Sequence, residues 1–156
     1  MTTAASRPSP DARRADLLLG LDIGGTKTAF AIGTAQGELL AHRRRPTEPS
    51  GDAVRDLQRI AGDARGLLDD LGAAPERLAA VGVSVPGPFD PARGLLLRPP
   101  NLPGWDDAPV RDVLARDFAC PIALENDANA AALAEWRYGA GRGHRDLVFL
   151  TMSTGV

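Results

Sequence analysis

The stretch of sequence that decides the fold is residues 17–32, LLLGLDIGGTKTAFAI. Its first part, residues 17–23, is an apolar run typical of a buried strand, and residues 28–32 alternate small and large side chains as a second strand does. The two glycines between them are typical of a tight turn. A further turn at residues 33–37 leads to a third strand over residues 38–42. The pattern therefore predicts a three-stranded antiparallel meander.

Downstream of the meander, helix and strand patterns alternate, so the sequence predicts an α/β domain. Residues 52–71 place apolar side chains three and four positions apart, which indicates an amphipathic helix that Gly72 ends. Six prolines between residues 86 and 105 predict an ordered loop or an irregular hairpin at a cleft edge. The remaining predicted elements are strands over residues 78–85, 122–125 and 147–152, a helix over residues 110–118, and a helix from Asn126 or Asp127 to about Tyr138.

Composition and charge exclude several classes of partner. The chain has 156 residues, of which 44% are hydrophobic and 24% charged, as in one globular domain with a sizeable core. Its formal net charge of -2 supplies no basic field for nucleic acid or an anionic membrane, so neither is expected as a partner. Residues 1–16 mix Pro, Ser, Arg and Ala without the apolar block of a signal peptide, which predicts a disordered tail.

The chain has a single cysteine, Cys120. One cysteine permits no intrachain disulfide and cannot supply the group of thiolates that a structural zinc site needs. A reducing, cytoplasmic location fits this composition best. Because Cys120 precedes a proline and a strand-like run, we interpret it as a buried packing residue without a chemical role.

The first group of residues that could carry chemistry is Asp22-Ile23-Gly24-Gly25-Thr26-Lys27. The glycines allow backbone N–H groups to approach phosphate oxygens, Thr26 and Lys27 add a hydroxyl and a positive charge, and Asp22 suits a magnesium ion held through water. The spacing does not match the Walker loop, because Thr26 occupies its lysine position. An ordinary tight turn is the alternative for this segment alone.

Two further groups lie near the end of the chain. Glu125, Asn126 and Asp127 stand at a strand-to-helix junction, where a helix N-terminus stabilises an ionised carboxylate by roughly 1 kcal/mol and ligands collect at the sheet edge. Asp127 alone is equally explained as a helix cap. Thr154 and Gly155 follow the last predicted strand and are consistent with either a second phosphate turn or an ordinary strand end.

Together with PGPFD at residues 86–90 and NLPGW at residues 101–105, the order and spacing of these groups resemble the ROK family. That family comprises bacterial sugar kinases and sugar-responsive repressors on the actin-like, ribonuclease-H-like ATPase fold. The resemblance extends over residues 17–156. It implies an actin-like ATPase lobe, and an activity of the glucokinase type, in which ATP phosphorylates a hexose.

The resemblance also implies a role for each residue singled out above. Asp127 matches the family's catalytic base, which takes the proton from the sugar hydroxyl. Asp22 is expected near the magnesium ion. The other matches are Gly24, Gly25, Thr26, Lys27, Thr154 and Gly155 for the ATP phosphates, and Gly87, Asn101 and Asn126, together with Asp127, for the sugar.

Part of the family pattern is missing from this chain. The rest of the second phosphate loop, the adenosine pocket and a cysteine-rich zinc motif would belong to a C-terminal lobe after residue 156. We therefore expect residues 17–156 to be the N-terminal lobe of a kinase, with ATP and Mg²⁺ as cofactors and no zinc site in this chain. The fragment is expected to be inactive alone. The family is commonly dimeric or tetrameric, so the resemblance allows a homo-oligomer of the complete protein, but the sequence does not indicate the oligomeric state.

There are two alternatives to an enzyme. The family's repressors carry a winged-helix DNA-binding domain before the glycine turn, and only about twenty residues precede Asp22, which is too few for that domain. A noncatalytic sugar-binding module is the other alternative. Asp127 separates it from a kinase, because binding alone does not require a proton acceptor.

Overall fold

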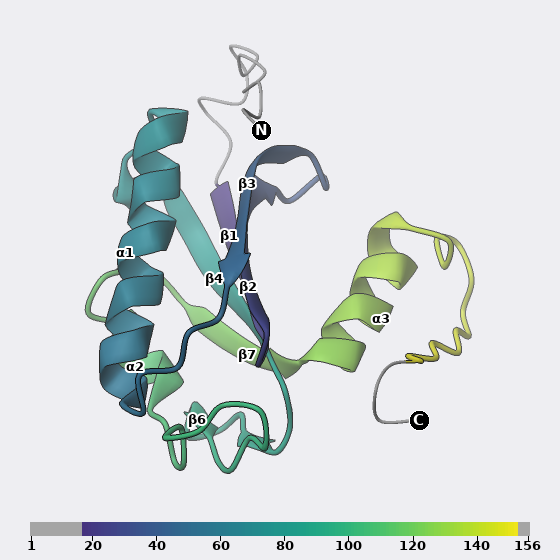
Figure 1. The fold of residues 1–156 in the computed structure, drawn as a ribbon. Coiled ribbons are helices and arrows are strands. Elements are labelled where there is room, and N and C mark those ends of the chain that lie inside the picture. Colours follow the sequence, from purple (N-terminus) through teal and green to yellow (C-terminus); the bar gives the residue numbers. More distant parts are fainter. Residues whose placement is uncertain (1–16, 153–156) are drawn as a thin grey trace.

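A five-stranded sheet with the order β3-β2-β1-β4-β7 organises residues 17–152, the part of the chain that the computed structural model describes (Figure 1). The first three strands form the predicted antiparallel meander, and β4 and β7 then continue the sheet parallel to β1. The tail predicted over residues 1–16 lies outside the described residues. The strands are β1 (Leu17–Ile23), β2 (Lys27–Thr34), β3 (Leu39–Pro46), β4 (Leu78–Val85) and β7 (Ile122–Asn126).

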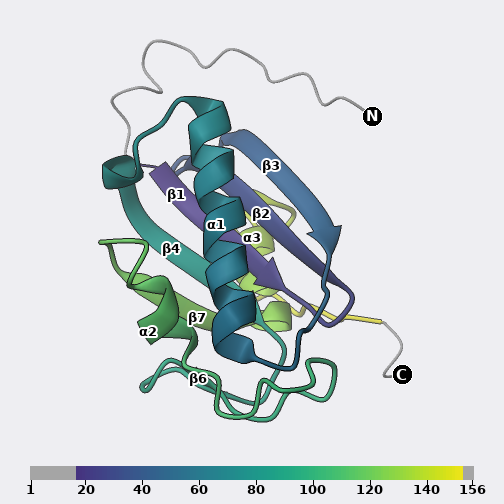
Figure 2. The ribbon, with the colours of Figure 1, turned by 60° about the vertical axis from the view of Figure 1, so that its left-hand side comes forward.

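One face of the sheet carries the core because strand residues alternate between the two faces. Along β1, Leu17, Leu19, Leu21 and Ile23 are at most 1% exposed, whereas the residues between them are half-buried. Helix α1 (Ala53–Leu71) lies across this buried face (Figure 2). Burying one leucine side chain fully stabilises the fold by about 1.5–3 kcal/mol. The buried side chains of β1 therefore anchor the strand that ends at Asp22.

Helix α1 confirms the prediction for residues 52–71. Asp52 is its N-cap and accepts a hydrogen bond from the N–H of Arg55 at 3.1 Å. Gly72 ends it in the left-handed conformation, with φ of 69°, where glycine is least strained. No helix within residues 17–152 is long and apolar enough to cross a membrane.

The proline-rich segment forms the predicted irregular hairpin, with strands β5 (Phe89–Asp90) and β6 (Leu95–Leu96). Helix α2 (Val110–Leu114) follows it and ends four residues before the predicted boundary. The reason is local: the N–H groups of Arg116 and Asp117 bond to carbonyls three residues back, so the helical ladder tightens into turns. The apolar side chains of the predicted helix are nevertheless all buried.

Helix α3 (Asp127–Tyr138) has the predicted bounds and lies on the opposite side of the sheet from α1 and α2 (Figure 1). None of its residues is buried. The strand predicted over residues 147–152 is wrong, because this segment has no regular structure and Val148 is 84% exposed. A strand requires a neighbour to satisfy its backbone groups, and no described strand lies beside this segment.

Cys120 is a half-buried free thiol that packs against the core. Burial raises the pKa of this thiol above its usual value, which lowers the fraction of reactive thiolate at neutral pH. This environment is that of a packing residue, as predicted.

Candidate functional site

The carboxyl-terminal ends of β1, β4 and β7 meet at one edge of the sheet. In the parallel register, Asp22 of β1 lies beside Ser84 of β4, and Ser84 lies beside Glu125 of β7. Asn126 is paired one step further along, with Val85. The Asp22 and Asn126 groups, which are far apart in the sequence, therefore share the edge at which α/β sheets bind ligands.

Asp22 is oriented by a residue that the sequence analysis missed. The hydroxyl of Ser84 donates a hydrogen bond of 2.9 Å to Oδ1 of Asp22. Within residues 17–152, no donor contacts Oδ2 of this half-buried carboxylate. A carboxylate with one oxygen held and one available fits a magnesium ion bound through water. The available signal for Ser84 was a single hydroxyl among the small and apolar residues of β4.

The turn between β1 and β2 presents unpaired backbone donors. Gly24 closes the turn, because its N–H donates to the carbonyl of Lys27 at 3.0 Å. The N–H groups of Gly25 and Thr26 donate to no acceptor in the described part of the chain. The side chains of Thr26 and Lys27 are exposed. Free amides, a hydroxyl and an ammonium group in one turn fit the oxygens of a phosphate.

Thr47, directly after β3, holds this turn from the side. Its hydroxyl contacts the carbonyl of Gly24 at 2.7 Å and the hydroxyl of Thr28 at 2.9 Å. Its N–H also donates to the carbonyl of Thr26 at 3.0 Å. Nothing in the local sequence indicates that Thr47 reaches the turn, so it was not among the predicted site residues.

Thr47→Val should lower the free energy of unfolding of this chain by about 1–3 kcal/mol. Valine keeps the shape of threonine but leaves the fully buried hydroxyl of Thr28 and the carbonyl of Gly24 without this partner. Urea unfolding measures the change. Thr26→Val is the matched control, because the exposed hydroxyl of Thr26 has no described partner, and it should stay within about 0.5 kcal/mol of the parent. Equal losses in the two variants would contradict the bracing role of Thr47.

The NLPGW segment lies directly on the same turn. A Cβ atom added at Gly25 would stand 2.4 Å from Cβ of Asn101 and 2.6 Å from its carbonyl oxygen. Only a residue without a side chain fits this approach. The structure thus brings Asn101, a predicted sugar residue, against the predicted phosphate turn.

Asn126, rather than Asp127, is the N-cap of α3. Its Oδ1 accepts hydrogen bonds from the N–H groups of Ala128 at 3.0 Å and Asn129 at 3.4 Å. Its Nδ2 donates to no described acceptor and lies next to Gly87, where an added Cβ would be 3.8 Å away. Asn126 therefore offers a donor, not an acceptor, to a ligand at this edge.

Asp127 is the first residue of α3, and its side chain is exposed. Oδ1 accepts a hydrogen bond from the N–H of Ala128 at 2.8 Å, and no described donor contacts Oδ2. The N–H groups of the first helical turn favour a negative charge here. Asn126 is thus the N-cap, and Asp127 keeps one carboxylate oxygen without a described partner.

Two predicted site residues lie outside the described residues. These are Thr154 and Gly155, so the second phosphate turn stays a prediction. In residues 17–152, no three His, Cys, Asp or Glu side chains come together as a group that could hold a metal ion.

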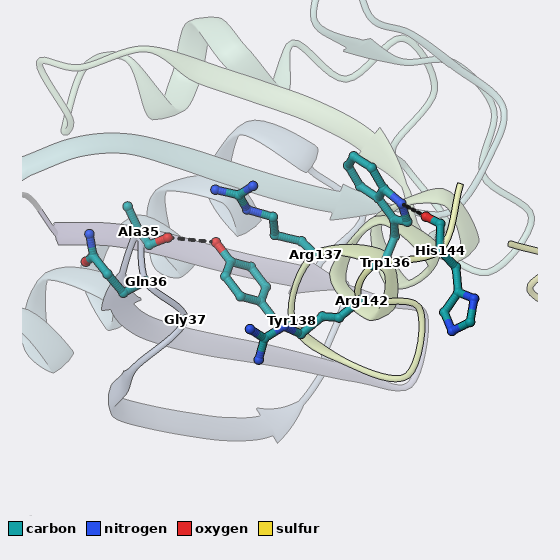
Figure 3. Close-up of a pocket in the computed structure, with 9 residues that line it drawn as sticks. Ala35, Gln36, Gly37, Trp136, Arg137, Tyr138, Arg142 and His144 are labelled. Carbon is teal, nitrogen blue, oxygen red and sulfur yellow. Dashed lines mark hydrogen bonds between the residues drawn. The ribbon is translucent and has the colours of Figure 1, made fainter. Parts of the chain in front are cut away.

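The groove of about 720 Å³ in Figure 3 lies away from this edge. The β2–β3 turn at residues 35–37 lines one side of it, and the end of α3 with the residues that follow lines the other. The hydroxyl of Tyr138 joins the two sides by donating to the carbonyl of Ala35 at 3.0 Å. Trp136, which lines the groove, comes nine residues after Asp127, or about 13 Å along the helix, so the groove lies at the other end of α3 from the candidate site.

Comparison with known proteins now identifies the family. The model of the ROK family matches residues 18–156. This chain belongs to the ROK family. The chain is similar to two curated glucokinases. The glucokinase of Thermotoga maritima is 35% identical over 89% of this chain, and that of Streptomyces coelicolor is 32% identical over 90%. Each alignment spans 42% of the relative, so the chain covers about two fifths of the length of these ROK proteins.

Solved ROK structures confirm the actin-like α/β fold. The ROK hexokinase of Thermus thermophilus superimposes with a TM-score of 0.67 at 40% identity, covering 77% of this chain and 38% of its own. A ROK glucokinase from Streptomyces griseus, in complex with glucose and AMPPNP, superimposes with a TM-score of 0.70 at 35% identity. The superposition covers 82% of this chain and 38% of the glucokinase chain.

A regulator is also similar in sequence. The xylose repressor of Bacillus spizizenii is 23% identical over 92% of this chain, and the alignment spans 37% of the repressor. Membership of the ROK family therefore includes both enzymes and regulators.

Proposed function

We propose that residues 17–156 are the N-terminal lobe of a glucokinase-like enzyme that transfers the γ-phosphoryl group of ATP to a hexose. The observation that carries this proposal is Asp127, an exposed carboxylate directly after the N-cap Asn126 of α3, with one oxygen that has no described partner. It follows the strand end that shares a sheet edge with Asp22. The relatives are longer than this chain, which covers 42% of each, and the additional length is enough for a second lobe.

Each predicted residue has a place in this reaction. The N–H groups of Gly25 and Thr26, with Lys27, would hold phosphate oxygens, and Asp22 would hold Mg²⁺ through water. Mg²⁺, when bound, supplies neutralisation of the phosphate charge. The second phosphate turn, at Thr154 and Gly155, is part of the same proposal.

At the sugar, Asn126 would donate from Nδ2 to a hydroxyl, and Asn101 and the backbone at Gly87 would form the wall beside it. The hydroxyl oxygen of the sugar forms a bond to the γ-phosphorus while the bond from phosphorus to the ADP oxygen breaks, and Asp127 accepts the hydroxyl proton. Such a transition state is loose, so positioning contributes most of the catalysis and the base acts late.

A sugar-responsive regulator or a noncatalytic sugar-binding module is the second candidate, and the match to the xylose repressor supports it. Both candidates use the sugar-binding residues, but only the enzyme requires a proton acceptor. The position of Asp127 favours the enzyme. We also propose a cytoplasmic location, because the single cysteine suits a reducing compartment. The zinc motif of the family pattern would belong to the second lobe.

The test compares this chain with an extended protein, in which the downstream coding sequence, or the matching part of the Streptomyces coelicolor glucokinase, continues it. A coupled assay with Mg-ATP and a panel of glucose, fructose, N-acetylglucosamine, N-acetylmannosamine and xylose detects phosphorylation. We expect turnover of at least one hexose by the extended protein and none by the 156-residue chain. Sugar binding without turnover by the extended protein would favour the regulator. Turnover by the short chain that survives repurification would contradict the need for a second lobe.

A further inference from the structure

Asp56 is a buried carboxylate in the first turn of α1, with only 3% of its surface exposed. It does not cap the helix, because Asp52 does so. Burying a carboxylate is unfavourable unless hydrogen bonds and charge partners replace its water. Asp56 was not among the residues that the sequence pattern singled out.

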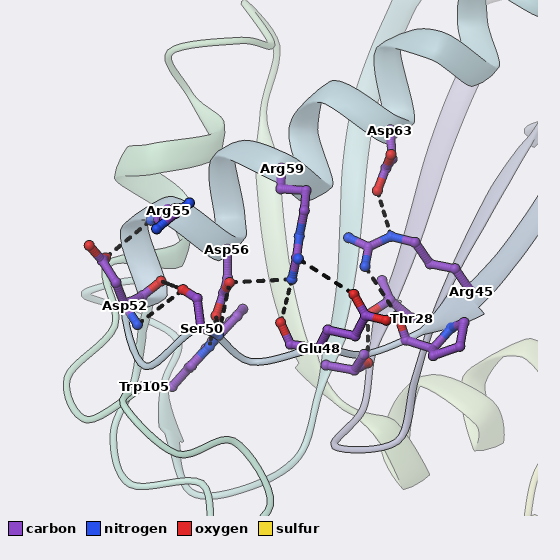
Figure 4. A network of polar contacts seen from close by, with 12 residues as sticks. Thr28, Arg45, Glu48, Ser50, Asp52, Arg55, Asp56, Arg59, Asp63 and Trp105 are labelled. Carbon is purple, nitrogen blue, oxygen red and sulfur yellow. Dashed lines mark hydrogen bonds and ion pairs between the residues drawn. The ribbon is translucent and has the colours of Figure 1, made fainter.

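Donors from three parts of the chain surround this carboxylate (Figure 4). The N–H of Ser50 contacts its two oxygens at 3.2 and 3.0 Å. The indole Nε1 of Trp105 donates to Oδ2 at 3.1 Å, and the guanidinium of Arg59 donates to Oδ1 at 3.3 Å. Asp56 thus ties the β3–α1 loop and the end of the NLPGW segment to α1.

The NLPGW segment is anchored at its carboxyl-terminal end. Trp105 is 1% exposed and Leu102 is fully buried, and the N–H of Trp105 donates to the carbonyl of Leu102 at 3.2 Å. At Gly104, with φ of 81°, an added Cβ would stand 2.3 Å from the carbonyl oxygen of Gly51. The segment is therefore pressed against the β3–α1 loop that Asp56 also holds.

The other end of the segment is exposed and carries Asn101, which lies on Gly25 of the phosphate turn. A continuous path runs from Asp56 through Trp105 to Asn101. Close packing already holds the buried Trp105 ring, and the hydrogen bond from Nε1 to Oδ2 of Asp56 adds a directional contact that links the ring to α1. Asp56 accordingly helps to fix the position of the NLPGW segment relative to α1.

We propose that Asp56 is a positioning residue of the sugar site, which acts through Trp105 to hold Asn101 at the wall between the sugar and the phosphate turn. This inference rests on the proposed sugar kinase function. Asp56 would act only through Asn101, which is proposed to contact the sugar and takes no part in proton transfer, so its loss should weaken sugar binding more than it slows the chemical step.

The decisive variants are Asp56→Asn and Trp105→Phe, made in the extended protein. Asparagine keeps the size of the side chain but cannot accept all of these hydrogen bonds, and phenylalanine keeps a buried ring without the Nε1 donor. Asp63→Asn is the matched control, because Asp63 lies further along α1 and pairs with Arg45, away from the NLPGW segment.

We expect Asp56→Asn and Trp105→Phe to raise KM for the hexose about tenfold while kcat stays within about threefold. The reason is that a contact made equally with the bound sugar and with the transition state affects KM and not kcat, and the loss of one hydrogen bond is worth about a factor of ten. Asp63→Asn should leave KM unchanged at temperatures where all variants are folded. A merely structural role would lower the melting temperature of each variant without moving KM.

A second measurement reports on the segment itself in the 156-residue chain. The chain has two tryptophans, so Trp136→Phe leaves Trp105 as the sole reporter. In that background, Asp56→Asn should shift the emission of Trp105 to longer wavelength and increase its quenching by acrylamide, whereas Asp63→Asn should not.

The outcomes separate this inference from the function on which it rests. If the unmodified extended protein neither binds nor phosphorylates a hexose, the proposed function fails and this inference fails with it. If that protein is active and both variants keep its KM while folded, this inference alone is overturned. If Asp56→Asn does not fold, Trp105→Phe decides by the same KM criterion.

Discussion

Asp127→Asn in the extended protein should lower kcat at least about a hundredfold, which is the contribution expected of a general base. Asparagine keeps the shape of the side chain and can still accept the hydrogen bond from the N–H of Ala128. It cannot take the proton of the sugar hydroxyl. Sugar affinity should therefore change far less than kcat, as measured by steady-state kinetics and by calorimetric titration of the sugar.

The structure makes this substitution a sharp test because Asn126 already caps α3. Little stability should be lost, and a thermal melt checks that the variant is folded. Asp106→Asn is the control, since Asp106 is an exposed aspartate without a proposed role. A near-normal kcat for Asp127→Asn would mean that the catalytic residue is wrongly assigned and would favour the noncatalytic module.

Gly25→Ala should lower the free energy of unfolding by about 1–3 kcal/mol, because the new methyl group has no room beside Asn101. The added Cβ would stand 2.4 Å from Cβ of Asn101, so the phosphate turn or the NLPGW segment must move. In the extended protein, kcat/KM should fall about a hundredfold or more, since a shift of about 1 Å at a positioning contact has an effect of that size. Urea unfolding and steady-state kinetics measure the two effects.

Gly62→Ala is the matched control for this substitution. Gly62 lies inside α1 with nothing within 4 Å of an added Cβ, so alanine should stabilise the chain by about 0.5–1 kcal/mol. Asn101→Gly added to Gly25→Ala should restore part of the stability, because the contact with Cβ disappears while the contact with the carbonyl oxygen remains. A Gly25→Ala protein as stable and active as the parent would show that the turn and the segment are not in contact.

Sequence alone predicted the elements whose signals are local. The alternation of β1 buries every second side chain, and α1 begins and ends at its capping residues, because period and capping are properties of neighbouring residues. The strand over residues 147–152 was wrong for the opposite reason. Its apolar run is a local signal, but a strand also needs a partner, and a partner is not encoded in the run itself.

The candidate site divides in the same way. The sequence by itself determined which chemical groups stand near the ends of the strands, since Asp22 is the last residue but one of the apolar run 17–23 and Asp127 comes three residues after Leu124. Tertiary structure alone decided that Ser84 orients Asp22, that Asn126 rather than Asp127 caps α3, and that Asn101 rests on Gly25. These contacts depend on which donor comes within about 3 Å of which acceptor, or which backbone approaches which glycine, after distant segments have packed. Parallel strands bring their ends to one edge, and so the fold assembled a site from groups that the sequence could only name separately.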